Sequence, residues 1–151
     1  MTEAQDQQRD NMKARNEQAK KERDMVLAHL YRLCQQDQRE KVIPTVIANM
    51  RSHPAVGGIR LWQLDSVMFN VSRRSACRLI RRMRETISDQ SHVKDGFTTV
   101  RWALESPEAT VRMTTWLWML LLREKLATFE IPKGFPYAQL FEPDGMEGKG
   151  F

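Results

Sequence analysis

The segment from Leu61 to Ile87 constrains the fold most, because its apolar residues recur at helical spacing. Its first part, Leu61–Phe69, fits a short helix, and Asn70-Val71-Ser72 then interrupts the pattern. Ser72 is a favourable N-cap for a second helix at about residues 73–87. The apolar stripe of that second helix consists of Ala76, Leu79, Ile80, Met83 and Ile87. The segment therefore predicts two helices joined by a tight turn.

Helical spacing also predicts helices on both sides of this segment. We expect one at about residues 22–38, one from Pro44 to His53, and one from Ser106 to Ala127. The last of these contains a run of seven apolar residues, Trp116–Leu122, which makes it apolar all round. Phe97–Leu104 fits either a strand of a short wing-like segment or a short helix. The predicted fold class is mostly α.

The two ends of the chain differ from this middle part. Residues 1–24 are charged and rich in Gln and Asn, which predicts a polar arm that is disordered or a helical extension. Residues 129–151 carry three of the six prolines and four of the seven glycines, which predicts an irregular tail. The helical domain is thus expected at residues 25–128.

No segment resembles a secretory signal or a membrane span. The N-terminus is polar, and the longest apolar run is seven residues, whereas a spanning helix needs roughly 20. Cys34 and Cys77 are distant in sequence and lack histidine partners at metal-ligand spacing. We therefore expect a cytoplasmic protein with reduced thiols, no bound metal, no cofactor and no membrane partner.

The positive charge is concentrated in one segment. The chain has 24 basic and 19 acidic residues, a formal net charge of +5. The segment between Arg60 and Ile87 holds seven arginines and two acids, so the rest of the chain has no net charge. These arginines are Arg60, Arg73, Arg74, Arg78, Arg81, Arg82 and Arg84. Such a focused patch suits phosphates and guanine edges.

The sequence NVSRRSACRLIRR, which begins at Asn70, resembles the turn and recognition helix of helix-turn-helix DNA-binding proteins. Ser66 takes the small position of the first helix, and Phe69 is the hydrophobic residue before the turn. Asn70 takes the left-handed position and Val71 is the turn hydrophobe. The opening residues and the packing positions of the second helix are Ser72, Arg73, Arg74, Ala76 and Leu79. Two positions depart from the family pattern: Asp65 stands where a hydrophobic residue is usual, and Ser66 replaces the commoner alanine.

The resemblance implies that the N-terminal part of the second helix enters the major groove. The candidates for base edges are Ser72, Arg73, Arg74, Cys77 and Arg78. The candidates for phosphates are Arg81, Arg82 and Arg84, which lie further along the helix. The implied function is sequence-specific binding of double-stranded DNA by a transcriptional regulator, such as a repressor, of phage, plasmid or bacterial type.

Two other functions remain open. The chain could be a DNA-binding subunit of a packaging, replication or recombination assembly, or a domain that binds protein or RNA. Catalysis is not expected: His29, His53 and His92 form no paired motif, and no glycine-rich phosphate loop is present.

The apolar helix of residues 106–127 bears on the oligomeric state. A helix that is apolar all round must be covered on every side. A partner subunit is the simplest cover, which predicts a homodimer. The competing interpretation is that the helices at 22–38 and 43–52 enclose it within one chain.

Overall fold

The computed structural model describes residues 2–105, 107 and 109–127, and that part of the chain is mostly helical. The predicted mostly α fold class is confirmed. The α-helices are α1 (Glu3–Gln35), α2 (Val42–Ser52), α3 (Leu61–Phe69), α4 (Arg73–Thr86), α5 (Val100–Leu104) and α6 (Ala109–Arg123). The short 3-10 helices are η1 (Arg39–Lys41), η2 (Pro54–Gly58) and η3 (Asp95–Phe97). No strand occurs in the described residues, where a single antiparallel bridge joins Arg60 to Thr99.

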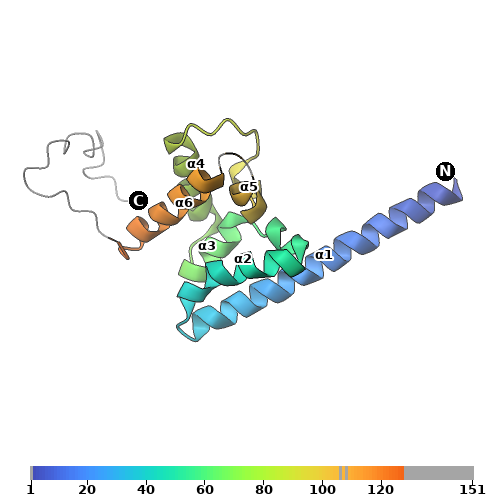
Figure 1. Ribbon diagram of the computed structural model, residues 1–151, viewed down its shortest axis with the longest axis horizontal. Helices are drawn as coiled ribbons and strands as arrows, with labels where there is room; N and C mark the ends of the chain where they lie inside the picture. The colour runs from blue at the N-terminus through green and yellow to red at the C-terminus, as the bar shows by residue number, and fades with distance from the viewer. Residues whose placement is uncertain (1, 106, 108, 128–151) are drawn as a thin grey trace, which may run out of the picture.

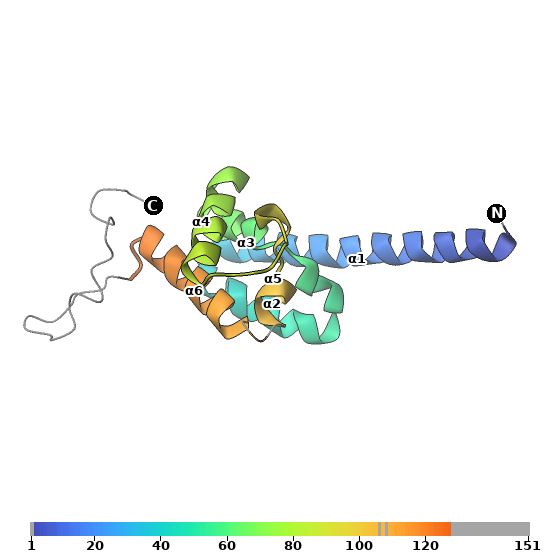
Figure 2. The same ribbon diagram turned by 90° about the horizontal axis from the view of Figure 1, so that it is seen from above.

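Helix α1 begins at Glu3, well before the predicted start at residue 22, so the polar arm is a helical extension. Two carboxylates in its first turn, Glu3 and Asp6, stabilise the positive end of the helix. Its other end lies at Gln35, three residues earlier than predicted, because Asp37 adopts a left-handed φ of 60°. The N-terminal half of α1 protrudes beyond all the other helices (Figures 1 and 2).

Helices α2 and α6 differ slightly from their predicted bounds. Helix α2 begins at Val42, so Pro44 lies inside the first turn, where a proline costs no hydrogen bond. Helix α6 ends at Arg123 rather than Ala127, and Lys125 beyond it has a φ of 56°. Ser106, the predicted start of this helix, and the predicted tail at 129–151 lie outside the described residues.

The ambiguous stretch from Phe97 to Leu104 forms the short helix α5 rather than a strand of a wing. Thr99 caps α5, with its hydroxyl accepting a hydrogen bond from the amide of Trp102 at 3.1 Å. The residues just before α5 are extended only where they run beside the residues just before α3. There the amide of Leu61 donates to the carbonyl of Thr98 at 3.0 Å. This crossing attaches the loop after α4 to the start of α3.

The core is one cluster to which all six of the described α-helices contribute: α1 packs against α2, η2 and α3, and α4 packs against α3 and α6. Its fully buried large side chains include Leu30, Leu64, Ile80 and Trp116. Helix α6 lies chiefly against α4 and α5, as Figures 1 and 2 show, and not in an enclosure of α1 and α2. One side of α6 therefore stays open, and Trp118 is 42% exposed whereas Trp116 is 0% exposed.

Among the described helices, none has the length and apolar character needed to cross a membrane.

Candidate nucleic-acid interface

The turn between α3 and α4 has the local geometry expected from its sequence. Asn70 has φ 54° and ψ 39°, the left-handed conformation that asparagine tolerates better than most residues. Ser72 caps α4, and its hydroxyl accepts from the amide of Ser75 at 3.1 Å. The Ser66 hydroxyl donates to the carbonyl of Val71 at 2.7 Å, which fixes the chain between the two helices. These contacts orient α4 with respect to α3.

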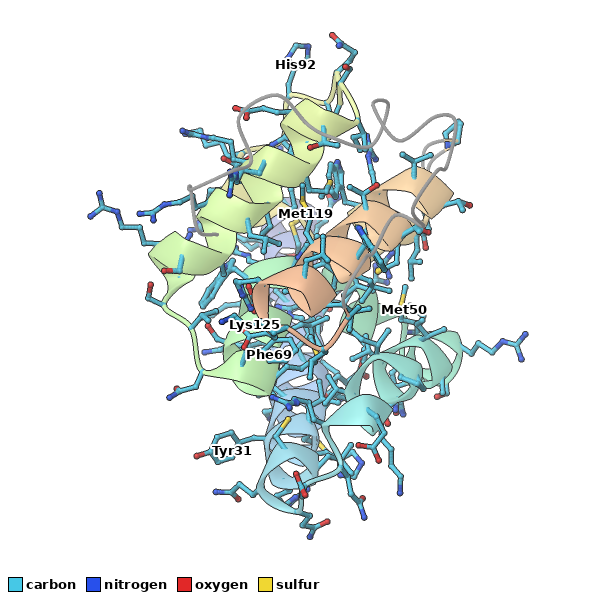
Figure 3. The ribbon with its side chains drawn as sticks, turned by 90° about the vertical axis from the view of Figure 1, so that its left-hand side faces the viewer. Tyr31, Met50, Phe69, His92, Met119 and Lys125 are labelled. Carbon is cyan, nitrogen blue, oxygen red and sulfur yellow. The ribbon has the colours of Figure 1, made fainter. Side chains whose placement is uncertain are left out.

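Helix α4 has one apolar face in the core and one basic face in solvent. Ala76, Leu79, Ile80 and Met83 are buried against the rest of the domain. The exposed members of the predicted site are Ser72, Arg73, Arg74, Arg78 and Arg81. The half-buried members are Cys77, Arg82 and Arg84. In Figure 3, long side chains of α4 extend from one side of the molecule, clear of the other helices.

Three exposed arginines form the centre of this face. Arg74, Arg78 and Arg81 follow one another at i, i+4 and i+7, and together with Cys77 and Asp95 they line a hollow of about 310 Å³. The Arg81 side chain is 70% exposed, although its Nε lies 3.2 Å from Asp95 Oδ2. Within the described part of the chain, no carboxylate forms an ion pair with Arg74 or Arg78.

Arg73 is oriented by its neighbours at the start of α4. Its guanidinium lies 4.9 Å from the centroid of the Trp62 ring, a cation–π distance. A Cβ on Gly96 would lie 2.9 Å from Arg73 Nη2, so the loop after α4 passes close to this side chain. Burial raises the pKa of the nearby Cys77 thiol, and the charge and hydrogen bond of Arg73 only partly oppose it. Cys77 is therefore a neutral thiol at neutral pH.

Arg84, which the sequence made a candidate for phosphates, is largely buried and is not part of the exposed face. Its side chain is 14% exposed and pairs with Asp89 and Asp95, each at 2.9 Å. The same guanidinium donates to the carbonyls of Ser91 at 2.6 Å and Val93 at 2.5 Å. Arg84 thus attaches the loop after α4 to the helix, and its donors already have protein acceptors.

The structure contains a charged cluster around Asp89 that the sequence analysis did not predict. Asp89 accepts from Arg84 and also from Arg112 on α6, whose Nη2 lies 2.7 Å from Asp89 Oδ1. Burial would raise the pKa of Asp89, but the hydrogen bonds and charges of the two arginines outweigh it and lower the pKa. Both guanidiniums also lie near the Trp102 ring, at 4.1 Å for Arg112 and 5.6 Å for Arg84. The pair Asp95-Gly96 is typical of a turn, but it indicates none of the charged partners.

Asp65, the departure from the family pattern, pairs with a residue far along the chain. The carboxylate is 0% exposed and binds Arg123 of α6 through two hydrogen bonds of 2.5 and 2.8 Å. Asp65 therefore forms a buried salt bridge that joins α3 to α6. A carboxylate can be buried at this position because a planar guanidinium satisfies both of its oxygens.

The described residues contain no group of three or more His, Cys, Asp or Glu side chains placed to hold a metal ion. Comparisons with protein-family models, with curated proteins and with solved structures gave no match to this chain.

Proposed function

We propose that the protein binds double-stranded DNA sequence-specifically, with α3, the turn at Asn70 and α4 acting as a helix-turn-helix. The observation that carries this proposal is the outer face of α4, where Arg74, Arg78 and Arg81 are exposed on one stripe. A helix of about this width fits the major groove, and arginine is the residue that most often contacts guanine there.

The proposed contacts follow from position along α4. Ser72, Arg73, Arg74, Cys77 and Arg78 lie in its first half, the part that reaches base edges in this class of protein. Arg81 and Arg82 lie further along and suit phosphates. We leave Arg84 out of the proposed contacts, because its guanidinium is engaged by the loop after α4.

The biological role that suits such a protein is transcriptional regulation in the cytoplasm of a bacterium, including repression by a phage or plasmid regulator. The action is binding rather than catalysis, and it involves no cofactor. We also propose a homodimer, because the open side of α6 exposes Val111, Trp118 and Leu121. Light scattering at micromolar concentration, with Trp118→Glu as the comparison, tests this part; a mass of one chain for both proteins would contradict it.

The response of DNA affinity to salt tests the proposed function. Each phosphate that an arginine neutralises releases counterions, with a slope of about −0.9 in log K against log salt for each contact. We expect the dissociation constant for a duplex to rise steeply from low to physiological salt, and a selection from random duplexes to return a preferred sequence. An affinity that does not change with salt would rule out the proposed electrostatic contacts.

A further inference from the structure

Most of the charged side chains in the protruding half of α1 lie in two separate stripes, and Arg15 lies outside both. Residues 2–18 are all exposed, so packing against the domain does not explain their pattern. At 3.6 residues per turn, the basic stripe follows i, i+4, i+7 and i+11 and consists of Arg9, Lys13, Asn16 and Lys20. About a quarter turn away lies an acidic stripe that consists of Glu3, Asp6, Asp10 and Glu17. We refer to these as the basic stripe and the acidic stripe.

The basic stripe lies on the same side of the molecule as the outer face of α4. Tyr31 follows Lys13 by 18 residues, which is about five full turns of helix, so the two side chains point in the same direction along the straight α1. Figure 3 shows that Tyr31 points to the side of the molecule on which long side chains of α4 extend. A duplex lying on that side of the molecule would face both elements.

The cations of the basic stripe are available for a ligand. Within residues 2–105, 107 and 109–127, no carboxylate forms an ion pair with Arg9, Lys13 or Lys20. From Arg9 to Lys20 the stripe extends about 16 Å, the length of about five base pairs. Lysine and arginine at this spacing suit a row of phosphates rather than base edges.

We propose that the protruding half of α1 is a second DNA-binding element. Arg9, Lys13 and Lys20 bind phosphates of the duplex that flanks the segment contacted by α4, without reading its sequence. This inference rests on the proposed function, because the helix-turn-helix sets the position of the duplex. The acidic stripe lies about a quarter turn from the basic stripe and repels phosphates, which limits the contact to one side of the arm.

The test compares two duplexes with the full-length protein. Both carry the sequence that the protein selects from a random pool; one ends at the edge of the selected site and the other extends about ten base pairs on each side. The main variant is the triple change Arg9→Gln, Lys13→Gln and Lys20→Gln. Glutamine keeps a high helix propensity, so α1 is preserved, and circular dichroism checks this.

We expect the triple variant to bind the long duplex several-fold more weakly and the short duplex unchanged. Its salt slope on the long duplex should be shallower by about 2.7, which is about 0.9 for each of three lost contacts. The matched pair Lys20→Gln and Lys21→Gln sharpens the test, since Lys21 is the next residue but lies on the acidic stripe. Only Lys20→Gln should weaken binding of the long duplex.

The outcomes separate this inference from the proposed function. Absence of binding to either duplex by the unchanged protein would overturn the proposed function. If the unchanged protein binds DNA and the triple variant binds the long duplex with the same affinity, the role of the arm is overturned and the proposed function is not. Equal losses for Lys20→Gln and Lys21→Gln would show an effect of net charge and would overturn the assignment to one stripe. If the triple variant no longer self-associates without DNA, but its dimer binds DNA with the affinity of the unchanged protein, the basic stripe contacts a second copy of the chain and not DNA.

Discussion

Arginines one turn apart on α4 have opposite environments. The Arg81 side chain is 70% exposed and touches one carboxylate, whereas the Arg84 side chain is 14% exposed and has two carboxylates and two carbonyls as partners. Arg123 on α6 resembles Arg84, because it is 13% exposed and binds the buried Asp65. The molecule therefore has an exposed set of arginines and an enclosed set.

The difference teaches that carboxylates outside an arginine's own helix decide whether that arginine is enclosed. An arginine is charged at any ordinary pH, so an enclosed one needs acceptors for its donors and a balancing charge. Asp65, Asp89 and Asp95 supply these for the enclosed set. The exposed set keeps donors that DNA phosphates or base edges can use.

The largest expected effect comes from breaking an enclosed pair. Asp65→Ala leaves Arg123 without its buried partner, and removal of one member of such a pair costs about 3–5 kcal/mol. We expect the free energy of unfolding from urea titration to fall by about that amount. The matched control is Glu85→Ala, the exposed acid of α4, which should change it by less than about 0.5 kcal/mol. Equally small losses in the free energy of unfolding for Asp65→Ala and Glu85→Ala would contradict the distinction between enclosed and exposed arginines.

A second comparison uses the same substitution in both sets. Arg84→Met removes four hydrogen bonds to the loop after α4 and should lower the free energy of unfolding by about 3 kcal/mol. Arg78→Met, on the exposed face, should change it by less than about 0.5 kcal/mol. Hydrogen exchange should also show faster exchange at Val93 in the Arg84 variant only. Similar unfolding energies of the two variants would contradict the enclosed role of Arg84.

Much of the helical framework was predictable, because local signals specify it. Leu61–Phe69 and the start of α4 follow from apolar spacing and from Ser72 as a cap, and Asn70 has the left-handed backbone that its position implied. The sequence left the start of α1 open between two alternatives for a physical reason: a polar segment without apolar periodicity is compatible with a solvated helix and with a disordered arm.

The enclosed arginines could not be predicted, because their carboxylate partners lie outside their own helices, and two of the pairs are far apart in sequence. Asp65 and Arg123 are 58 residues apart, and Asp89 and Arg112 are 23 residues apart. Neither spacing corresponds to neighbours on one helix. The exposed face of α4 was easier, since helical periodicity alone separates Arg74, Arg78 and Arg81 from the apolar stripe. Sequence spacing thus separates the faces of one helix, but not the pairs that join different helices.

Within the exposed set, position along α4 should separate arginines that recognise bases from arginines that bind phosphates. Arg74→Ala should weaken binding to the selected DNA sequence by about 1–3 kcal/mol more than binding to unrelated DNA, if it contacts a base through two hydrogen bonds. Arg81→Ala should weaken binding to both DNAs alike, because a phosphate contact carries no sequence information. Fluorescence anisotropy with the two duplexes measures both effects. The same losses on both DNAs for both variants would contradict the division.

The smallest expected effect is the response of the enclosed set to acid. The pKa of Asp89 in the folded protein is lowered: burial would raise it, but Arg112 and Arg84 outweigh that effect. The unfolded chain has an aspartate pKa of about 3.9, so the ionised carboxylate stabilises the fold above that pH. This stabilisation is lost as the pH falls through the lower folded pKa.

Asp89→Asn tests this response, because the amide cannot titrate. The variant should be less stable than the unchanged protein at pH 7, since Arg84 and Arg112 lose their shared negative charge. Between about pH 5 and pH 3, however, its free energy of unfolding should decline less than that of the unchanged protein. Urea titrations at several pH values measure both slopes, and the other carboxylates contribute equally to each. If the free energy of unfolding falls equally with pH in the two proteins, protonation of Asp89 does not contribute to the loss of stability in acid.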